Sequence, residues 1–155
     1  MKRRAEVLKE VYQLEKHIEG GSFSEVYTAP FEASGRPLAG SIYFLLDGSE
    51  VSRLHVIDCD EIWYYHEGCG MKITVLSGSG MEEHLLGMNA GNGERAMVVI
   101  PMGCAFAAEN LDPDGFTFVS CATAPRFDYA GFRPLSEGEV REKYPDLFDR
   151  VKHLL

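Results

Sequence analysis

A histidine, a carboxylic acid and several aromatic side chains are concentrated in one stretch of the chain, residues 54–68. Side chains alternate between the two faces of a β-strand, so His55 faces one side of a strand that ends in a tight Asp-Cys-Asp turn. After this turn, Glu61, Trp63 and Tyr65 share one face of the next strand. If both faces point inward, an imidazole, a carboxyl, an indole and a phenol meet in one cavity. This spacing predicts a binding site for a small molecule.

His55 and Glu61 are the two residues of this stretch best suited to move protons. Desolvation in such a cavity raises the pKa of the Glu61 carboxyl, unless a protonated His55 pairs with it. A pair of this kind can do acid and base work on a bound polar metabolite. The structural alternative is a hydrogen-bonded pair that serves packing alone.

Neighbouring strands supply further candidates for the same cavity. Phe23, Glu25 and Tyr27 share one face of a predicted strand. Arg53 has the same parity as His55, so we expect it either to meet an anionic ligand or to form a salt bridge at the rim. Phe23 is also explained as a core residue, whereas the phenol of Tyr27 needs a polar partner if it is buried.

The length, charge and cysteine content of the chain limit the kinds of molecule that it can be expected to bind and the compartment in which we expect it. With 155 residues the chain is long enough for one domain with its own core. Its 15 basic and 24 acidic residues give a net charge of -9, which argues against nucleic acid or an anionic membrane as a partner. Charges interrupt every apolar run near the N-terminus, so we expect no signal peptide, no membrane span and a cytoplasmic location. The four cysteines form no CxxC pair, which indicates free thiols.

The hydrophobic pattern predicts a single all-β domain, residues 1–155, with a helix at each end. Residues 1–16 have the spacing of an amphipathic helix, and Ser136 with Glu139 has the spacing of a helix cap that opens a C-terminal helical segment, residues 136–155. Between them, short strands separated by Gly, Pro, Asn or Asp predict a barrel or sandwich over residues 21–133. The predicted strands are 22–28, 38–46, 51–57, 61–67, 71–76, 81–86, 96–100, 104–108 and 116–123, followed by a tail strand or cover segment in 126–133.

Two spacings resemble the sequence motifs of the cupin superfamily. His55-x-Ile57-x3-Glu61-x6-Gly68 resembles the first motif, HxH-x3-E-x6-G, with isoleucine at its second histidine. The stretch Pro101-x-Gly103-x2-Phe106-x3-Asn110 resembles the second motif, PxG-x2-H-x3-N, with phenylalanine at its histidine. The two motifs occur in the expected order.

A longer set of residues is similar to the uncharacterised cupin family DUF985, or cupin_5. It consists of His17-x-Glu19-Gly20-Gly21 with Glu25 and Tyr27, Ile42-Tyr43-Phe44-Leu45-Leu46, Asp60-Glu61-Ile62-Trp63, Leu86-Gly87 and Ala124-Pro125-x-Phe127-Asp128. The resemblance covers most of the chain, from about His17 to Leu147. It implies a cupin-type jelly-roll β-barrel, a homodimer, and a ligand pocket in the mouth of the barrel.

The departures from the cupin motifs bear on metal binding. Metal-dependent cupins hold their ion with three histidines and a glutamate, and only His55 and Glu61 of that set remain here. Ile57 and Phe106 cannot donate an electron pair, so we expect no metal and no cofactor. With Phe106 added to Phe23, Tyr27, Trp63 and Tyr65, the predicted pocket becomes an aromatic cleft with few polar groups, as is usual for small-molecule sites.

Three hypotheses from different classes follow. The first is a metal-independent cupin that binds a sugar-like or other polar metabolite. The second is an isomerase or epimerase that resembles the metal-free sugar epimerases of the superfamily, with His55 as base, Glu61 beside it, and Tyr27 or Tyr65 as acid. The third is a structural or storage-type homodimer with a vestigial pocket.

Overall fold

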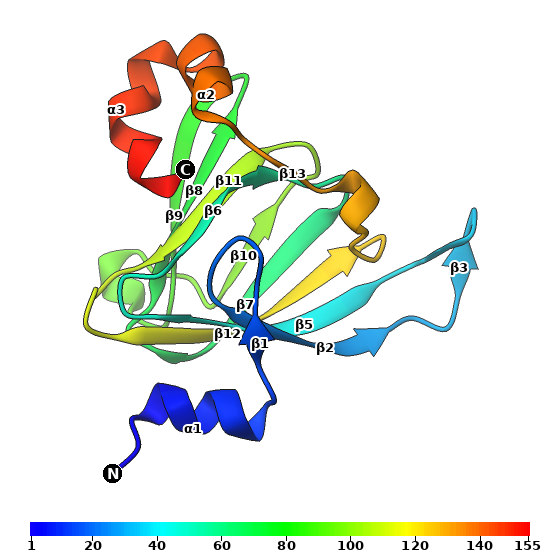
Figure 1. Cartoon of the computed structure of the whole chain (residues 1–155), viewed down its shortest axis with the longest axis vertical. Helices are drawn as coiled ribbons and strands as arrows, with labels where there is room; N and C mark the ends of the chain where they lie inside the picture. The colour runs from blue at the N-terminus through cyan, green and yellow to red at the C-terminus, as the bar shows by residue number, and fades with distance from the viewer.

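A computed structural model describes residues 1–155. Two antiparallel sheets pack face to face (Figure 1). The six-stranded sheet has the order β1 (Glu15–Lys16), β2 (Ser22–Thr28), β5 (Gly40–Asp47), β12 (Phe116–Ala124), β7 (Asp60–Gly68) and β10 (Met97–Ile100). The five-stranded sheet has the order β13 (Arg133–Pro134), β6 (Val51–Val56), β11 (Ala105–Asn110), β8 (Met71–Ser77) and β9 (Gly80–Leu86). The strands β3 (Glu32–Ala33) and β4 (Arg36–Pro37) form a small hairpin that projects from the body. This is the jelly roll that the sequence predicts.

The main core lies between the two sheets because each strand buries alternate side chains on its inner face. The six-stranded sheet contributes Phe44, Leu46 and Val119, and the five-stranded sheet contributes Ile73 and Phe106. A pocket that shares Phe44, Ile57 and Trp63 with this core opens between the sheets.

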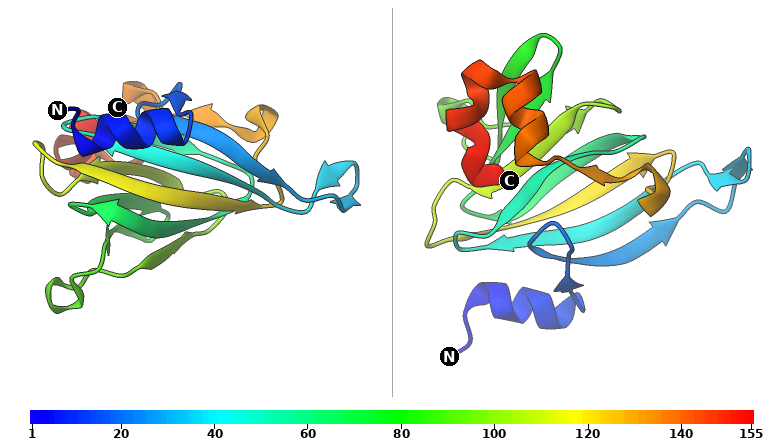
Figure 2. Two further views of the ribbon diagram at one scale, coloured as in Figure 1. Left: turned by 90° about the horizontal axis from the view of Figure 1, so that it is seen from below. Right: turned by 45° about the horizontal axis from the view of Figure 1, so that its top comes forward.

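A helix covers part of the outer face of each sheet (Figure 2). Helix α1 (Arg4–Val11) packs Ala5 and Leu8 against the six-stranded sheet. Helices α2 (Glu137–Lys143) and α3 (Phe148–Val151) cover the five-stranded sheet. The Ser136 hydroxyl accepts a hydrogen bond from the backbone N–H of Glu139 at 3.2 Å, so the predicted helix cap is confirmed. Short 3₁₀ turns complete the chain: Ala90–Asn92, Tyr129–Gly131, Pro145–Leu147 and Lys152–Leu154. No helix is long and apolar enough to cross a membrane.

The structure differs from the predicted elements at both ends of the barrel. The N-terminal helix stops at Val11, well before residue 16, because Gln13 takes a left-handed backbone conformation with φ of 53° and the chain then pairs with β2 as β1. For residues 126–133, predicted as a tail strand or a cover segment, the structure favours the cover segment: only Arg133 pairs, as the start of β13, and Tyr129–Gly131 form a turn. This segment therefore crosses the open edge of the barrel instead of extending a sheet.

Candidate functional site

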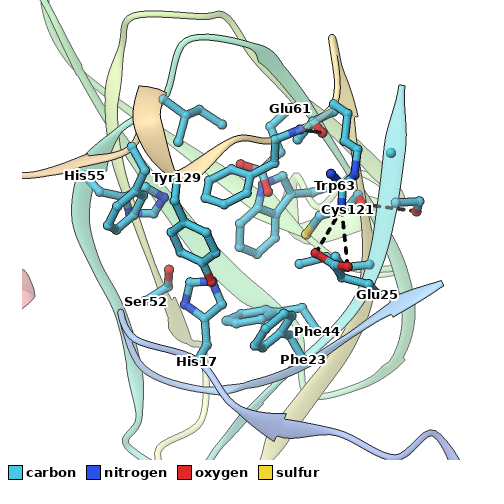
Figure 3. A pocket seen from close by; sticks show the side chains of 18 of the residues that line it. His17, Phe23, Glu25, Phe44, Ser52, His55, Glu61, Trp63, Cys121 and Tyr129 are labelled. Atoms are coloured by element: carbon cyan, nitrogen blue, oxygen red, sulfur yellow. Dashed lines mark hydrogen bonds and ion pairs between the residues drawn. The ribbon is translucent and has the colours of Figure 1, made fainter. Parts of the chain in front are cut away.

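The main pocket opens between the two sheets and has a volume of about 760 Å³, including the part open to solvent. Its lining combines aromatic and aliphatic side chains with a small number of buried polar groups (Figure 3). The residues from the predicted set that line it are Phe23, Glu25, Tyr27, His55, Glu61 and Trp63. Its position between the sheets and its mixed aromatic and polar lining are those of a small-molecule site.

His55 is a buried, neutral imidazole with a fixed tautomer. It is 6% exposed, and burial lowers its pKa to about 4. Its Nδ1 lies 2.6 Å from the carbonyl oxygen of Arg53, which can only accept, so Nδ1 carries the proton. Nε2 then holds a lone pair and makes no hydrogen bond within the chain. The ring packs against Phe106 with centroids 4.3 Å apart and the ring planes tilted by 54°, a contact that helps to fix its orientation.

Glu61 lies on the inner face of β7 and is buried in the same pocket, at 8% exposure. Burial raises the pKa of its carboxyl to about 7, and the neighbouring side chains of Cys121 and Trp63 offset only part of this rise. His55 does not influence this carboxyl as a cation, since the imidazole is neutral. Near neutral pH, Glu61 is therefore present both as the protonated acid and as the carboxylate.

Trp63 offers the pocket an unused hydrogen-bond donor. Its side chain is 2% exposed and its indole N–H has no partner of good geometry in the chain. An unpaired donor at such burial costs about 1–3 kcal/mol, which a suitable acceptor from a ligand or water recovers. The indole lies on the pocket wall beside Cys121 (Figure 3).

His17 is a pocket residue that was not among the predicted site residues. It follows β1 in the loop before Gly20 and Gly21, and its ring packs on Phe23 with centroids 4.9 Å apart. Burial lowers its pKa. The alternation of side chains along a strand gives no information about His17, because His17 lies in a loop. The family pattern could have indicated His17 as a site residue, since it contains this histidine close to two glycines.

Residues after β12 form the mouth of the pocket and were not predicted as site residues. Arg126 lies there and contacts the carboxylate of Glu25 at 3.3 Å. The backbone N–H of Phe127 donates to Thr123 at 2.8 Å, which turns the chain inward over the pocket. Tyr129 extends across the opening as drawn in Figure 3. Tyr27 also lies at the mouth, and 53% of it is exposed.

The expectation that Arg53 faces the cavity is wrong. In the pairing of β6 with β11, His55 lies opposite Phe106 but Ser52 lies opposite Ala108, so β6 carries one extra residue. Such a bulge changes the alternation of side chains. Ser52 therefore faces the pocket together with His55, while Arg53 is exposed on the outside.

Tyr65 and Phe106 do not line the pocket either. Tyr65 is four residues beyond Glu61 on β7, roughly 13 Å along the strand, and its hydroxyl donates to the carbonyl of Gly68 at 2.8 Å. Phe106 is 1% exposed and lies in the core behind His55. Both side chains face inward as predicted, but they contact the core and not the pocket.

The donor set does not fit the metal centre of metal-dependent cupins. Ile57 lines the pocket and Phe106 lies behind it, and neither side chain has an electron pair to donate. No three His, Cys, Asp or Glu side chains gather closely enough to hold an ion. The side chains present therefore do not form the metal centre of metal-dependent cupins.

Comparisons with known proteins agree with this architecture. The family model described as "Cupin superfamily (DUF985)" matches residues 6–135. The crystal structure of protein SO0799 from Shewanella oneidensis is similar with a TM-score of 0.91 and 33% identity, over 99% of this chain and 98% of that one. A hypothetical protein from Leishmania major has a TM-score of 0.91 and 27% identity, over 98% of each chain. No curated protein matches the chain.

The more distant similarities concern the fold alone. Oxalate decarboxylase from Bacillus subtilis has a TM-score of 0.59 and 17% identity, over 90% of this chain and 37% of that one. The jelly roll and its interior pocket are those of the cupin fold. Since the family model spans most of the chain, the protein belongs to the DUF985 family of the cupin superfamily.

Proposed function

We propose that the protein binds a small polar metabolite, sugar-like in the distribution of its hydroxyl groups, in the pocket between the sheets and without a metal. One observation carries the proposal: buried polar atoms with unused hydrogen-bonding capacity face an otherwise aromatic pocket. These are Nε2 of His55, the carboxyl of Glu61 and the indole N–H of Trp63. Aromatic walls suit the apolar faces of a ring, and the few polar groups fix its orientation.

A thermal-shift screen of wild-type protein against a panel of metabolites tests this proposal. We expect at least one neutral polyhydroxylated compound to raise the melting temperature, and Glu61→Met to abolish that shift because methionine removes the polar group and keeps the length. Tyr65→Phe is the matched control, since it removes a polar group from the same strand outside the pocket. If no compound shifts the wild type, the vestigial-pocket hypothesis replaces this one.

Acid–base catalysis of an isomerisation is the second candidate, favoured by the pKa of Glu61. A general base works best when its pKa lies near the operating pH. Glu61, at about 7, meets this condition, whereas His55, at about 4, is a weak base. We therefore assign the proton transfer to Glu61 and a hydrogen-bonding role to His55. Incorporation of deuterium from D₂O into a bound metabolite, lost in Glu61→Gln, would support this candidate, and a metabolite that binds without any exchange would rule against it.

The homodimer implied by the family resemblance is part of the proposal. Light scattering of the purified protein would measure its mass in solution, and the monomer mass of 17.3 kDa would contradict it.

A further inference from the structure

One wall of the pocket is built from three uncharged polar side chains, and the proposed function assigns no shared role to them. We call this the imidazole wall: His17 from the loop between β1 and β2, and Ser52 and His55 from β6. Figure 3 shows these three on one side of the pocket, with Glu61, Trp63 and Cys121 on the other. Ser52 and His55 are 4% and 6% exposed.

The two imidazoles of this wall have opposite hydrogen-bonding roles. Nδ1 of His17 accepts a hydrogen bond from the backbone N–H of Glu19 at 3.1 Å, so the proton of the neutral ring is on Nε2. His55 has the reverse arrangement, with the proton on Nδ1 and a lone pair on Nε2. His17 therefore offers a donor and His55 an acceptor. The Ser52 hydroxyl makes no hydrogen bond within the chain and can take either role.

The loop that holds His17 is tightly placed. The backbone N–H of Arg53 donates to the carbonyl of Glu19 at 3.0 Å, which ties the loop to β6. Gly20 has φ of 106°, and a Cβ there would lie 2.0 Å from the carbonyl oxygen of Val51. Because the loop and the strand are in contact, the donor and the acceptor are oriented before a ligand arrives.

This donor and acceptor set matches a hydroxyl group, which donates one hydrogen bond and accepts two. A carboxylate would meet the lone pair of His55 and would find no cation on this wall. The one arginine of the pocket, Arg126, lies at the mouth and contacts Glu25. An ammonium would in turn face the donor of His17. The three side chains of this wall carry no charge, so an ion that contacts the wall alone finds no counter-charge there, which is costly. The wall itself therefore discriminates against both ions.

We propose that the imidazole wall is a subsite for an uncharged hydroxyl group of the ligand and that His17 determines this specificity. The inference rests on the proposed function, because it describes how one side of that pocket recognises its occupant.

Three fragments with the same ring test the subsite: cyclohexanol, cyclohexanecarboxylate and cyclohexylamine. Binding to the full chain is measured by NMR titration, with the indole N–H signal of Trp63, the single tryptophan, as the report of pocket occupancy. We expect cyclohexanol to bind at least tenfold more tightly than either ion. We expect His17→Asn to weaken cyclohexanol about five- to tenfold, the effect of one net hydrogen bond.

The variants separate recognition from folding. In His17→Asn, the asparagine Oδ1 can still accept from the Glu19 N–H, so the loop is retained. The shorter amide does not reach the position of Nε2, so the donor is withdrawn from the subsite. His55→Asn likewise keeps a donor for the Arg53 carbonyl and removes the Nε2 acceptor, and it should weaken cyclohexanol similarly. His84→Asn, on β9 outside this pocket, is the control and should change nothing. Thermal unfolding of each variant verifies that it is folded.

The outcomes distinguish the two proposals. If cyclohexanol moves the Trp63 signal equally in wild type and in folded His17→Asn, or if either ion binds as tightly, the subsite is overturned and the binding pocket stands. If the fragments do not bind but a metabolite of the panel moves the Trp63 signal, the subsite alone is again overturned. If neither fragments nor metabolites move that signal, both proposals fail.

Discussion

Glu61→Gln and His55→Asn are expected to change the slope of the free energy of unfolding against pH in opposite directions between pH 4.5 and pH 6.5. Burial raises the pKa of Glu61 from 4.5 to about 7, so in this range the native state holds a proton that the unfolded state has released. The contribution of this proton to the free energy of unfolding is fully present below pH 4.5. It is lost as the pH rises to about 7, at about 1.4 kcal/mol per pH unit.

His55 has the opposite effect over nearly the same range. Burial lowers its pKa from 6.5 to about 4, so the unfolded state binds a proton that the native state excludes. Its contribution to the free energy of unfolding is fully present above pH 6.5 and is lost as the pH falls to about 4, again by about 1.4 kcal/mol per pH unit. In the wild type the two slopes therefore cancel between pH 4.5 and pH 6.5.

Each variant removes one of these slopes and reveals the other. Relative to the wild type, the free energy of unfolding of Glu61→Gln should rise by about 3 kcal/mol from pH 4.5 to pH 6.5, and that of His55→Asn should fall by about the same amount. Urea unfolding at a series of pH values in this range measures both, with His84→Asn as the control. Curves that run parallel to the wild type in both variants would show that neither group is buried as described.

Phe106→Ala is expected to lower the free energy of unfolding by about 3–5 kcal/mol, because it leaves a cavity in the core between the sheets. Phe31→Ala is the matched control: the same change at a ring that is 73% exposed should cost less than about 0.5 kcal/mol. Urea unfolding of the two variants makes the comparison. A similar small loss in both would contradict the placement of Phe106 behind His55 and return it to the set of possible ligand contacts.

The sequence predicted the strands of the barrel well because their hydrophobic alternation and turn residues are local signals. The strand from Asp60 to Gly68, with Glu61 and Trp63 facing inward, was predicted within one residue at each end. The family resemblance added the jelly-roll class of the barrel and the position of the pocket. These two sources together were enough to bring His55 and Glu61 into one cavity.

The errors at the site have structural causes that a single sequence does not reveal. Because of the bulge in β6, Ser52 faces the pocket in place of Arg53. A bulge depends on how two strands pair, which a single sequence does not reveal. His17 enters the pocket from a loop whose position is set by its contact with a distant strand. Arg126 and Tyr129 reach the mouth because the chain crosses the barrel after β12. The sequence left a tail strand and a cover segment open here and did not assign these residues to the site.

The indole of Trp63 is the most direct reporter of the pocket, because it is the one tryptophan of the chain and its N–H has no partner there. Titration of ¹⁵N-labelled protein with each metabolite that raises the melting temperature measures whether that N–H acquires an acceptor. We predict a downfield shift of the indole proton on binding, and at least a fivefold loss of affinity in Trp63→Phe. Metabolites that stabilise the protein while leaving the indole signal unmoved would contradict the placement of the binding site between the two sheets.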